Sequence, residues 1–571
     1  MGQLLEHFQR RSEHLAGNVK FSSSTPLAEI DQRARLEPIW RSRRLGLLAS
    51  LEWTVVGTLA ILVLLGFGLR VSQLGAIGFA EDEMNKLDAV RAYEKGDFSA
   101  NAEHPMVMKA LMYLSLHANR ALQGGATSPG SEEAALRLPN ALIGALTVIP
   151  LFLLTSAFFD RWTGLLAAAF WAFGINAITH NRIGKEDTLL VFFMLFAFYY
   201  FLRAKQTSPA NTPVRRRNYI ASAVAFGLMI ASKYFPHYLA LNMLYHHNFH
   251  VRKAQPGEPT GKTPGLFFVL IVAVLLLANP AVLLPQVWHY LNQYMGEHLL
   301  THSGYLLANH LYKNNMSSTP FWGTPIYFYL LFLAIKVPLL IVAGFLTGLL
   351  VSIKRRRQGG HGFLIFMFLF WLVPYSLIGG KWLRYTLALM PFVYMLTAVG
   401  VAALIRAATS HFPARKNAAL VFSVLGVVIF IALPAWTALA NGPHYALYTN
   451  ALAAGKAGHF FPHDEFYDDG LREAIKYVCD TAPQGATIAH ETPAVAAYYL
   501  TTFGRQDLDS RTISAQDFNP ANTTGPTYVI VQRGRTYFEN RDEIAFVRGT
   551  FKKTYEVSIE GAIAAEVFVK E

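Results

Sequence analysis

Long apolar segments separated by short polar breaks are the feature that most constrains the fold of this chain. A helix needs about 20 predominantly apolar residues to cross the hydrocarbon core of a bilayer. About eleven segments come close to that length or exceed it, and the first is too long and too far from residue 1 for a cleavable signal peptide. They are 46–69, 136–158, 163–180, 185–202, 218–234, 235–250, 265–286, 325–352, 362–379, 384–405 and 417–440. We therefore predict a multispan α-helical membrane protein with about eleven transmembrane helices.

The composition agrees with a membrane protein and excludes several other classes. Only 15% of the residues are charged and 53% are hydrophobic, whereas soluble domains carry about 25% charged residues. Aromatic residues make up 13% of the chain, which argues against disorder. The single cysteine, Cys479, excludes an intramolecular disulfide framework and a multi-cysteine zinc site.

The basic residues indicate the orientation, because short cytoplasmic loops of membrane proteins are enriched in Lys and Arg. If the number of spans is odd, all the basic segments lie on one side, and we assign this side and the N-terminus to the cytoplasm. The segments contain Arg41, Arg43 and Arg44; Arg203, Lys205 and Arg215 to Arg217; Arg252, Lys253 and Lys262; Lys354 to Arg357; and Arg406, Arg415 and Lys416. We expect an integral protein of the bacterial inner membrane.

The formal net charge of +13 divides according to this topology. Residues 71–133 contain 9 acidic and 5 basic residues, and residues 441–571 contain 17 and 12, so the tail carries −5 and the rest of the chain +18. A nucleic-acid-binding protein gathers its basic residues on one soluble face, whereas here five cytoplasmic segments share them. We expect no nucleic-acid partner.

Three regions follow from this division. Residues 1–45 form a cytoplasmic arm, 46–440 a transmembrane module and 441–571 an exoplasmic (periplasmic) domain. Within the module, 71–133 is a first exoplasmic loop with helices near 82–95 and 105–122, and 287–324 is a second large exoplasmic loop. In the tail, periodicity predicts a small α/β domain with helices at 467–480 and 493–502 and strands at 486–490, 527–532, 545–550 and 562–569.

Three consecutive acids, Glu81, Asp82 and Glu83, lie about ten residues beyond the first span. Carboxylates at such a position serve in acid–base catalysis, but acids near a helix start also cap the helix and complement its dipole. Downstream, His104-Pro105 precedes a new helix with Lys109 one turn inside it, which also fits a plain turn with a surface lysine.

Charged residues within apolar surroundings indicate function more strongly, because they are unfavourable at membrane depth. Arg182, Lys185, Glu186 and Asp187 lie between two apolar segments, and Lys233 interrupts a third. Lys381 and Arg384 lie at the exoplasmic edge of the tenth span. A tight loop of mutually paired ions explains the first group equally well, and snorkelling to the headgroups explains the last. An anionic partner such as a phosphate would explain both, because Arg offers a bidentate fork and Lys a point charge.

Taken in order, these motifs resemble the polyprenyl-phosphate-sugar-dependent glycosyltransferases of the GT-C fold. That superfamily includes the family 39 protein O-mannosyltransferases and the lipid A aminoarabinose transferases. Asp82-Glu83 is similar to its Asp-Glu pair, and His104-Pro105 with Lys109 is similar to the mannosyltransferases' His-Pro-Pro-Leu-Gly-Lys motif, with Met106, Val107 and Met108 in place of its middle residues. Further similar positions are Arg137, Arg182 with Asp187, Gly227 to Lys233, and Lys381 and Arg384-Tyr385 with Pro391.

The resemblance implies transfer of one sugar, mannose or a related one, from a polyprenyl-phosphate carrier to a hydroxyl or amine of a protein Ser/Thr or a glycolipid. It implies Asp82 as the catalytic base with Glu83 beside it. It also implies donor and phosphate binding by His104, Lys109, Arg137, Arg182, Asp187, Lys233, Lys381 and Arg384. No cofactor is certain; a divalent ion (Mg or Mn) is used by some relatives, although Asp82 and Glu83 are too few ligands for a dedicated cage.

Two other classes stay open. A transporter or flippase for an anionic lipid-linked solute would use the same embedded cations, but the acid pair in a long loop and the lack of inverted repeats favour the enzyme. A structural subunit with the tail as an interaction module would leave Asp82, Arg182 and Arg384 without roles. Neither the arm nor the tail contains a motif that indicates chemistry.

Overall fold

A computed structural model describes residues 37–570 except 125–127, 129, 209–210, 250–261, 296–303, 315–320, 322 and 411–415. The predicted cytoplasmic arm lies largely outside the described residues. The chain divides into two compact units, Met1–Thr58 and Leu59–Glu571. All the contacts described below lie within the second unit.

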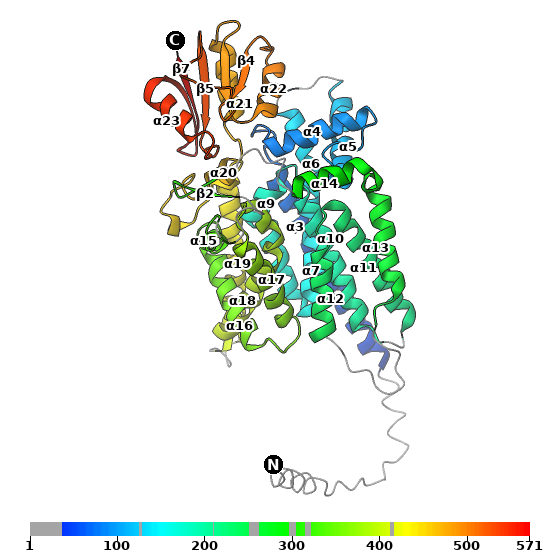
Figure 1. The fold of residues 1–571 in the computed structure, drawn as a ribbon. Helices are drawn as coiled ribbons and strands as arrows, with labels where there is room; N and C mark the ends of the chain where they lie inside the picture. The colour runs from blue at the N-terminus through cyan, green and yellow to red at the C-terminus, as the bar shows by residue number, and fades with distance from the viewer. Residues whose placement is uncertain are drawn as a thin grey trace, which may run out of the picture. The chain divides into compact units, whose positions relative to one another are not determined.

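The helices form where the sequence is continuously apolar (Figure 1). Each of the eleven predicted apolar segments overlaps helix in the structure, which confirms the predicted multispan helical fold. These helices are α3 (Glu37–Val71), α6 (Ser131–Leu146), α7 (Val148–Phe158), α8 (Arg161–Phe173), α9 (Ile175–Asn181), α10 (Asp187–Gln206), α11 (Thr212–Ser232), α12 (His237–Phe249), α13 (Gly265–Ala278), α15 (Phe328–Ile335), α16 (Leu339–Lys354), α17 (His361–Leu377), α18 (Met390–Ser410) and α19 (Lys416–Ala440).

Not every helix is long enough to cross a bilayer alone. Among the described residues, five helical stretches are sufficiently long and apolar: Glu52–Val71, Ser131–Phe158, Asp187–Gln206, Met390–Ser410 and Asn417–Ala440. The number rises to seven if α8 and α9, bent by 55°, and α15 and α16, bent by 120°, each count as one broken span. The helices α13 and α17 are apolar but shorter. The figure of eleven spans therefore stays a prediction.

Glycines let α16 and α18 approach each other closely. A Cβ atom on Gly348 would lie 1.8 Å from the carbonyl oxygen of Leu396, and one on Gly400 would lie 2.0 Å from that of Gly344. Small residues at helix crossings in membrane proteins permit this backbone contact. The contact fixes α18, which follows the short 3-10 helix η2 (Leu383–Ala388) that carries Arg384.

Short helices and strands form in the two long loops that are predicted to be exoplasmic and in the tail. The first loop contains α4 (Glu81–Glu94) and α5 (Met106–Leu122), close to the predicted ranges. The second predicted loop, 287–324, contains most of α14 (Pro285–Met295) and the antiparallel hairpin of β1 (Gly304–Leu307) and β2 (His310–Lys313), while η1 (Pro280–Leu283) lies at the end of the predicted span 265–286. After α19 the chain forms η3 (Tyr445–Leu447), η4 (Ala451–Ala453) and α20 (Pro462–Phe466) before it enters the tail domain.

The tail domain contains a five-stranded sheet in the order β4-β3-β5-β7-β6, with α21, α22 and α23. Strand β3 pairs in parallel with β4 and β5, whereas β7 pairs antiparallel with β5 and β6. The elements are α21 (Leu471–Thr481), β3 (Thr487–His490), α22 (Pro493–Thr502), β4 (Asp509–Thr512), β5 (Thr527–Gln532), α23 (Arg541–Thr550), β6 (Lys552–Ile559) and β7 (Ala562–Lys570).

Side chains alternate between the two faces of this sheet, because successive residues of a strand point to opposite sides. Ile488 and Ile530 pack with the helices α21 and α22, while Val529 and Val531 pack with α23 on the other face. The first of these two cores continues into the first loop, where it includes Met84 and other side chains of α4 and α5, and on into α6. The tail domain and the first loop therefore share one hydrophobic core.

One predicted element of the tail is wrong. Residues 545–550 read as a strand, but they form the second half of α23, which begins after Asn540. Its acidic residues Asp542 and Glu543 lie in the first turn and Arg548 in the last, an arrangement that complements the helix dipole. These flanking signals outweigh the short β-branched stretch. The strands β4 and β6 were not predicted.

Candidate active site

The three acids of the first loop occupy the first turn of α4. Ala80, the residue before the helix, has an extended backbone, and Oε2 of Glu83 accepts its N–H at 3.1 Å. This is the contact of a capping residue at the third helical position. Glu83 therefore caps α4. The carboxylates of the three acids nevertheless have different partners.

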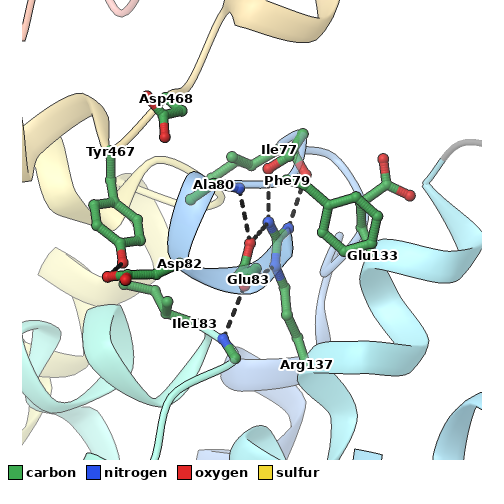
Figure 2. Close-up of polar contacts among 12 residues, drawn as sticks. Ile77, Phe79, Ala80, Asp82, Glu83, Glu133, Arg137, Ile183, Tyr467 and Asp468 are labelled. Carbon is green, nitrogen blue, oxygen red and sulfur yellow. Dashed lines mark hydrogen bonds and ion pairs between the residues drawn. The ribbon is translucent and has the colours of Figure 1, made fainter. Parts of the chain in front are cut away.

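Glu83 and Arg137 form a buried bidentate ion pair (Figure 2). The Arg137 Nε and Nη2 atoms donate to Oε1 and Oε2 of Glu83 at 2.8 and 2.6 Å, and the Gly184 N–H donates to Oε1 at 2.8 Å. Further guanidinium N–H groups donate, at 2.6–3.0 Å, to backbone carbonyls before α4, those of Leu74, Ile77 and Gly78. Arg137 thus fixes the loop that enters α4. Catalysis by Glu83 and phosphate binding by Arg137 stay predictions.

Asp82 lies among two cations and a tyrosine. The Lys185 Nζ lies 2.8 Å from its Oδ2, the Arg384 Nη1 donates to the same oxygen at 3.0 Å, and the Tyr467 hydroxyl donates to it as well (Figure 2 shows the tyrosine contact). The Asp82 side chain is 27% exposed, whereas that of Glu83 is 1% exposed. Of the two neighbouring acids, Asp82 is therefore the accessible one.

The surroundings keep Asp82 ionised. Burial opposes ionisation, but the charges of Lys185 and Arg384 and the hydrogen bonds from Lys185 and Tyr467 lower the pKa of Asp82 well below its ordinary value. A carboxylate held in this way is a proton acceptor at neutral pH and needs no prior deprotonation.

A second ion pair lies one turn further along α4. The Lys86 Nζ is 2.8 Å from Oε1 of Glu186, and Nδ1 of His104 is 3.7 Å from its Oε2. Burial lowers the pKa of His104 well below its ordinary value, and the nearby lysines add to this effect, so this imidazole is neutral at pH 7. Lys109 donates at 2.8–3.2 Å to the carbonyls of Ala100, Asn101 and His104. It thereby ties the His-Pro turn to α5.

Asp187 and Lys233 also pair. The Lys233 Nζ donates to Oδ1 of Asp187 at 2.6 Å, and both side chains are at most one-tenth exposed. The Lys233 ammonium also lies 5.5 Å from the ring centroid of Tyr385, next to Arg384 in the sequence. The structure therefore brings Asp187, Lys233 and the segment with Arg384 together, and donor binding by these residues stays a prediction.

Arg182 and Lys381, two further predicted phosphate ligands, contact backbone carbonyls, as Lys109 does. Arg182 donates to the carbonyls of Arg70, Ser72 and Gln73 at 2.7–3.1 Å and so holds the end of α3. Lys381 donates to the carbonyl of Thr324 at 2.6 Å and to that of Ile378. Their role in donor binding stays a prediction, and Arg384 is the late-span cation that reaches Asp82.

Three adjoining hollows meet at Asp464, a residue of α20. One of them is also lined by Lys185, Asp187, Arg384 and other residues of the Asp82 surroundings. Burial raises the pKa of Asp464 to about 6, in spite of hydrogen bonds and the positive charge of Arg384. The site thus consists of a charged wall beside α4 and a titratable carboxyl from the tail segment.

The sequence analysis missed several residues of this site. Lys185 and Glu186 stood in a charged stretch without an assigned role, and Lys86 was not considered. Asp464, Tyr467, Asp468 and Arg535 lie in a tail to which no chemistry was assigned. A signal existed in FPHDEFYDDG at 461–470, where four acids and three aromatic residues follow the last span closely.

The described carboxylates do not fit a divalent metal. Glu81, Asp82 and Glu83 each contact a cationic side chain: Arg535 at 2.8 Å, Lys185 at 2.8 Å and Arg137 at 2.6 Å, respectively. Within the part of the chain that the structure describes, no three His, Cys, Asp or Glu side chains are arranged to hold a metal ion. No step below is routed through a metal.

The fold and this geometry define a class: a multispan membrane protein with paired acids and cations beside a C-terminal α/β domain. Residues 121–283 match the family described as dolichyl-phosphate-mannose-protein mannosyltransferase. The match confirms the resemblance to the glycosyltransferases that use lipid-linked sugars, and it supports glycosyl transfer by an integral membrane protein as the general activity. A search of curated protein sequences finds no match.

Comparisons with solved structures give distant likenesses. ArnT from Cupriavidus metallidurans, bound to undecaprenyl phosphate, is 14% identical with a TM-score of 0.47, covering 90% of this chain and 98% of that one. The oligosaccharyltransferase AglB from Archaeoglobus fulgidus, in complex with an inhibitory peptide and a dolichol-phosphate, is 12% identical with a TM-score of 0.48, covering 90% and 74%. The Saccharomyces cerevisiae Pmt1-Pmt2 complex, bound to the sugar donor, is 18% identical with a TM-score of 0.30, covering 43% and 34%.

Proposed function

We propose that this protein transfers a single sugar, mannose or a related one, from a polyprenyl-phosphate carrier to a hydroxyl or amine acceptor. The acceptor is a protein Ser/Thr or a glycolipid on the exoplasmic face of a bacterial inner membrane. The observation that carries the proposal is the ionised, partly exposed carboxylate of Asp82 between Lys185 and Arg384. The matched family supports a lipid-linked mannose as the donor.

The reaction needs one base and several cations. The acceptor oxygen attacks the anomeric carbon and forms the new glycosidic bond, while the bond from that carbon to the phosphate oxygen breaks. The phosphate leaves with the bonding electrons as an anion, and Asp82 accepts the proton of the acceptor. Because the leaving group is already a stable anion, no carboxylic acid has to protonate it, unlike in glycosidases.

The charge balance of the site suits such a donor. The four cationic side chains Lys86, Lys185, Lys233 and Arg384 pair with the three carboxylates Asp82, Glu186 and Asp187, which leaves one positive charge in excess as long as the neighbouring Asp464 carboxyl, with a pKa of about 6, is protonated. A polyprenyl-phosphate sugar is a phosphodiester with one negative charge, and a second develops as the carrier leaves. Fixed cations in a partly buried site stabilise that developing charge strongly.

Binding of the phosphate also makes Asp82 a better base. Lys185 and Arg384 hold the pKa of Asp82 well below its ordinary value, and a phosphate that contacts the same cations shares their charge. The pKa of Asp82 then rises toward the acidity range in which a carboxylate accepts a proton effectively. The other predicted donor-binding residues would shape the donor site around these groups. They are His104, Lys109, Arg137, Arg182, Asp187, Lys233 and Lys381.

The direct test is sugar transfer by the purified protein in proteoliposomes. A panel of polyprenyl-phosphate sugars is offered with Ser/Thr peptides and glycolipids, and mass spectrometry follows carrier release and acceptor mass. Release of polyprenyl phosphate together with an acceptor that gains one sugar is expected for at least one donor. Movement of intact lipid-linked sugar across the bilayer without any release would favour the transporter instead and contradict the proposal.

A further inference from the structure

The segment that leads from α20 into the tail domain has an unusual backbone. Tyr467 and Asp468 both have positive φ values, 45° and 69°, in the left-handed region that non-glycine residues seldom occupy. Two consecutive residues in this conformation persist only when their surroundings hold them there, and such strain gathers at functional sites.

Contacts from both sides hold this turn. The Asp468 carboxylate pairs with the Arg535 guanidinium, accepts from the Gln532 side chain at 2.9 Å, and accepts the backbone N–H of Glu81 at 3.0 Å. Arg535 in turn contacts the Glu81 carboxylate at 2.8 Å. The tail is therefore fastened to the first residue of α4, directly beside Asp82.

The turn lies at a characteristic place in the sheet. Gln532 ends β5, and Arg535 follows it closely, next to the end of the parallel strand β3. From β3 the chain passes to β4 on one side of β3, and from β4 it passes to β5 on the other side of β3. The ends of the neighbouring strands β3 and β5 therefore form a topological switch point of the parallel strands. In open α/β sheets this is the crevice where ligands bind. Here Asp468 accepts a hydrogen bond from Gln532 at the end of β5.

The Tyr467 hydroxyl donates to Oδ2 of Asp82, the same oxygen that Lys185 and Arg384 contact. Three donors that converge on one carboxylate oxygen fix the rotation of the carboxyl group. They direct the other oxygen, Oδ1, to a defined position. A base that must take a proton from a bound acceptor depends on such positioning within a fraction of an ångström.

We propose that Tyr467 is a positioning residue for Asp82, so that the tail domain completes the catalytic site and Oδ1 of Asp82 is the atom that accepts the proton. The inference rests on the proposed glycosyl transfer. It assigns a role to a domain whose sequence contains no recognised motif. The Asp468–Arg535 pair keeps the turn in place, and the hydroxyl of Tyr467 acts on Asp82.

The test replaces only the hydroxyl, in the variant Tyr467→Phe. A matched control is Tyr498→Phe, because Tyr498 also joins the tail to the first loop, donating to Glu132 at 2.8 Å, but does not contact Asp82. For Tyr467→Phe we expect kcat to fall about 10- to 100-fold with the donor KM within about twofold of wild type. Because the lost hydrogen bond stabilises ionised Asp82, we also expect the acid limb of kcat to move about one pH unit upward. Tyr498→Phe should change neither quantity.

The possible outcomes separate the two proposals. If the wild type transfers sugar and Tyr467→Phe behaves like Tyr498→Phe, the positioning role is overturned and the proposed function stands. If Tyr467→Phe raises the donor KM without lowering kcat, the tyrosine binds the donor and does not position the base. If the wild type transfers no sugar from any donor of the panel, the proposed function fails, and this role fails with it. Matching unfolding midpoints of both variants exclude misfolding as the cause.

Discussion

Asp82 and Glu83 are adjacent in the first turn of α4, yet their carboxylates lie in opposite kinds of surroundings. Glu83 is 1% exposed and its described partners are Arg137, the N–H of Ala80 before α4 and the N–H of Gly184 in the loop between α9 and α10. Asp82 is 27% exposed and contacts Lys185, Arg384 and Tyr467 beside a hollow. The comparison teaches that one acid of the pair holds the backbone while the other stays accessible. Partners and exposure, more than residue type, separate the two roles.

Asp82→Asn tests the accessible acid of the pair and should have the largest effect. The amide keeps the shape of the side chain but cannot accept the acceptor's proton, so we expect sugar transfer to fall at least about 1,000-fold, while expression and donor binding persist. Turnover of proteoliposomes measures the effect. Asp88→Asn, an exposed acid of the same helix, is the control and should retain wild-type turnover; normal turnover by Asp82→Asn would refute its role as the base.

Glu83→Gln tests the buried acid of the pair, and this substitution should lower the stability of the folded protein. The substitution leaves the Arg137 guanidinium buried without its counter-charge, and breaking a buried ion pair in this way costs about 3–5 kcal/mol. We expect a clear drop in the thermal unfolding midpoint of the detergent-solubilised protein. An unchanged midpoint combined with lost turnover would instead make Glu83 a catalytic residue, as the sequence resemblance implied.

Arg384→Ala tests whether the arginine that contacts Asp82 also binds the phosphate of the donor. We expect the affinity for polyprenyl phosphate to weaken about 10- to 100-fold, because a charge-assisted contact with an anion is lost. Titration calorimetry with the carrier alone gives this affinity without any reaction. Arg161→Ala, at the start of α8 and away from the Asp82 contacts, provides the matched loss of one arginine, and equal affinity in Arg384→Ala and the wild type would contradict the assignment.

The smallest expected effect concerns Asp464, the tail carboxyl beside the same hollow. Its pKa is raised by burial to about 6 in the folded protein and is about 3.9 in an unfolded chain. Between these values the folded state binds more protons than the unfolded state, so this group makes stability fall as the pH rises from about 4 to about 6. In Asp464→Asn the free energy of unfolding should fall by about 1–2 kcal/mol less as the pH rises. Unfolding midpoints at pH 5 and pH 7 measure it, and equal pH dependence in both proteins would argue against the raised pKa.

The sequence predicts the helical body well, because a bilayer demands long apolar helices and the eleven segments stand out in the chain. It predicts the tail less completely. The strand β4 (Asp509–Thr512) is short and mostly exposed, so it has no apolar pattern. Residues 545–550 of α23 resemble a strand in isolation, and only the flanking Asp542, Glu543 and Arg548 identify the helix.

For the site, sequence order and resemblance were enough to single out Asp82, Asp187, Lys233 and Arg384, which the structure brings together in ion pairs. They could not distinguish cations that face carboxylates from cations that hold backbone carbonyls, such as Arg182 and Lys381. That distinction depends on which backbone carbonyl groups are left without another hydrogen-bond donor in the folded chain. Tyr467 could not be found from the sequence either, because its position depends on how the tail packs on the first loop.

The hydrogen bond between Tyr467 and Asp82 joins residues 385 positions apart, and this separation has a consequence for biosynthesis. A ribosome adds about 5–20 residues per second, so the first loop emerges about 20–80 s before the tyrosine that completes it. At the start of that interval the Asp82 carboxylate lacks all three of its partners, and once Lys185 and Arg384 have been added it still lacks the Tyr467 hydroxyl. If Tyr467 has the proposed positioning role, the chain completes its catalytic site only near the end of its own synthesis.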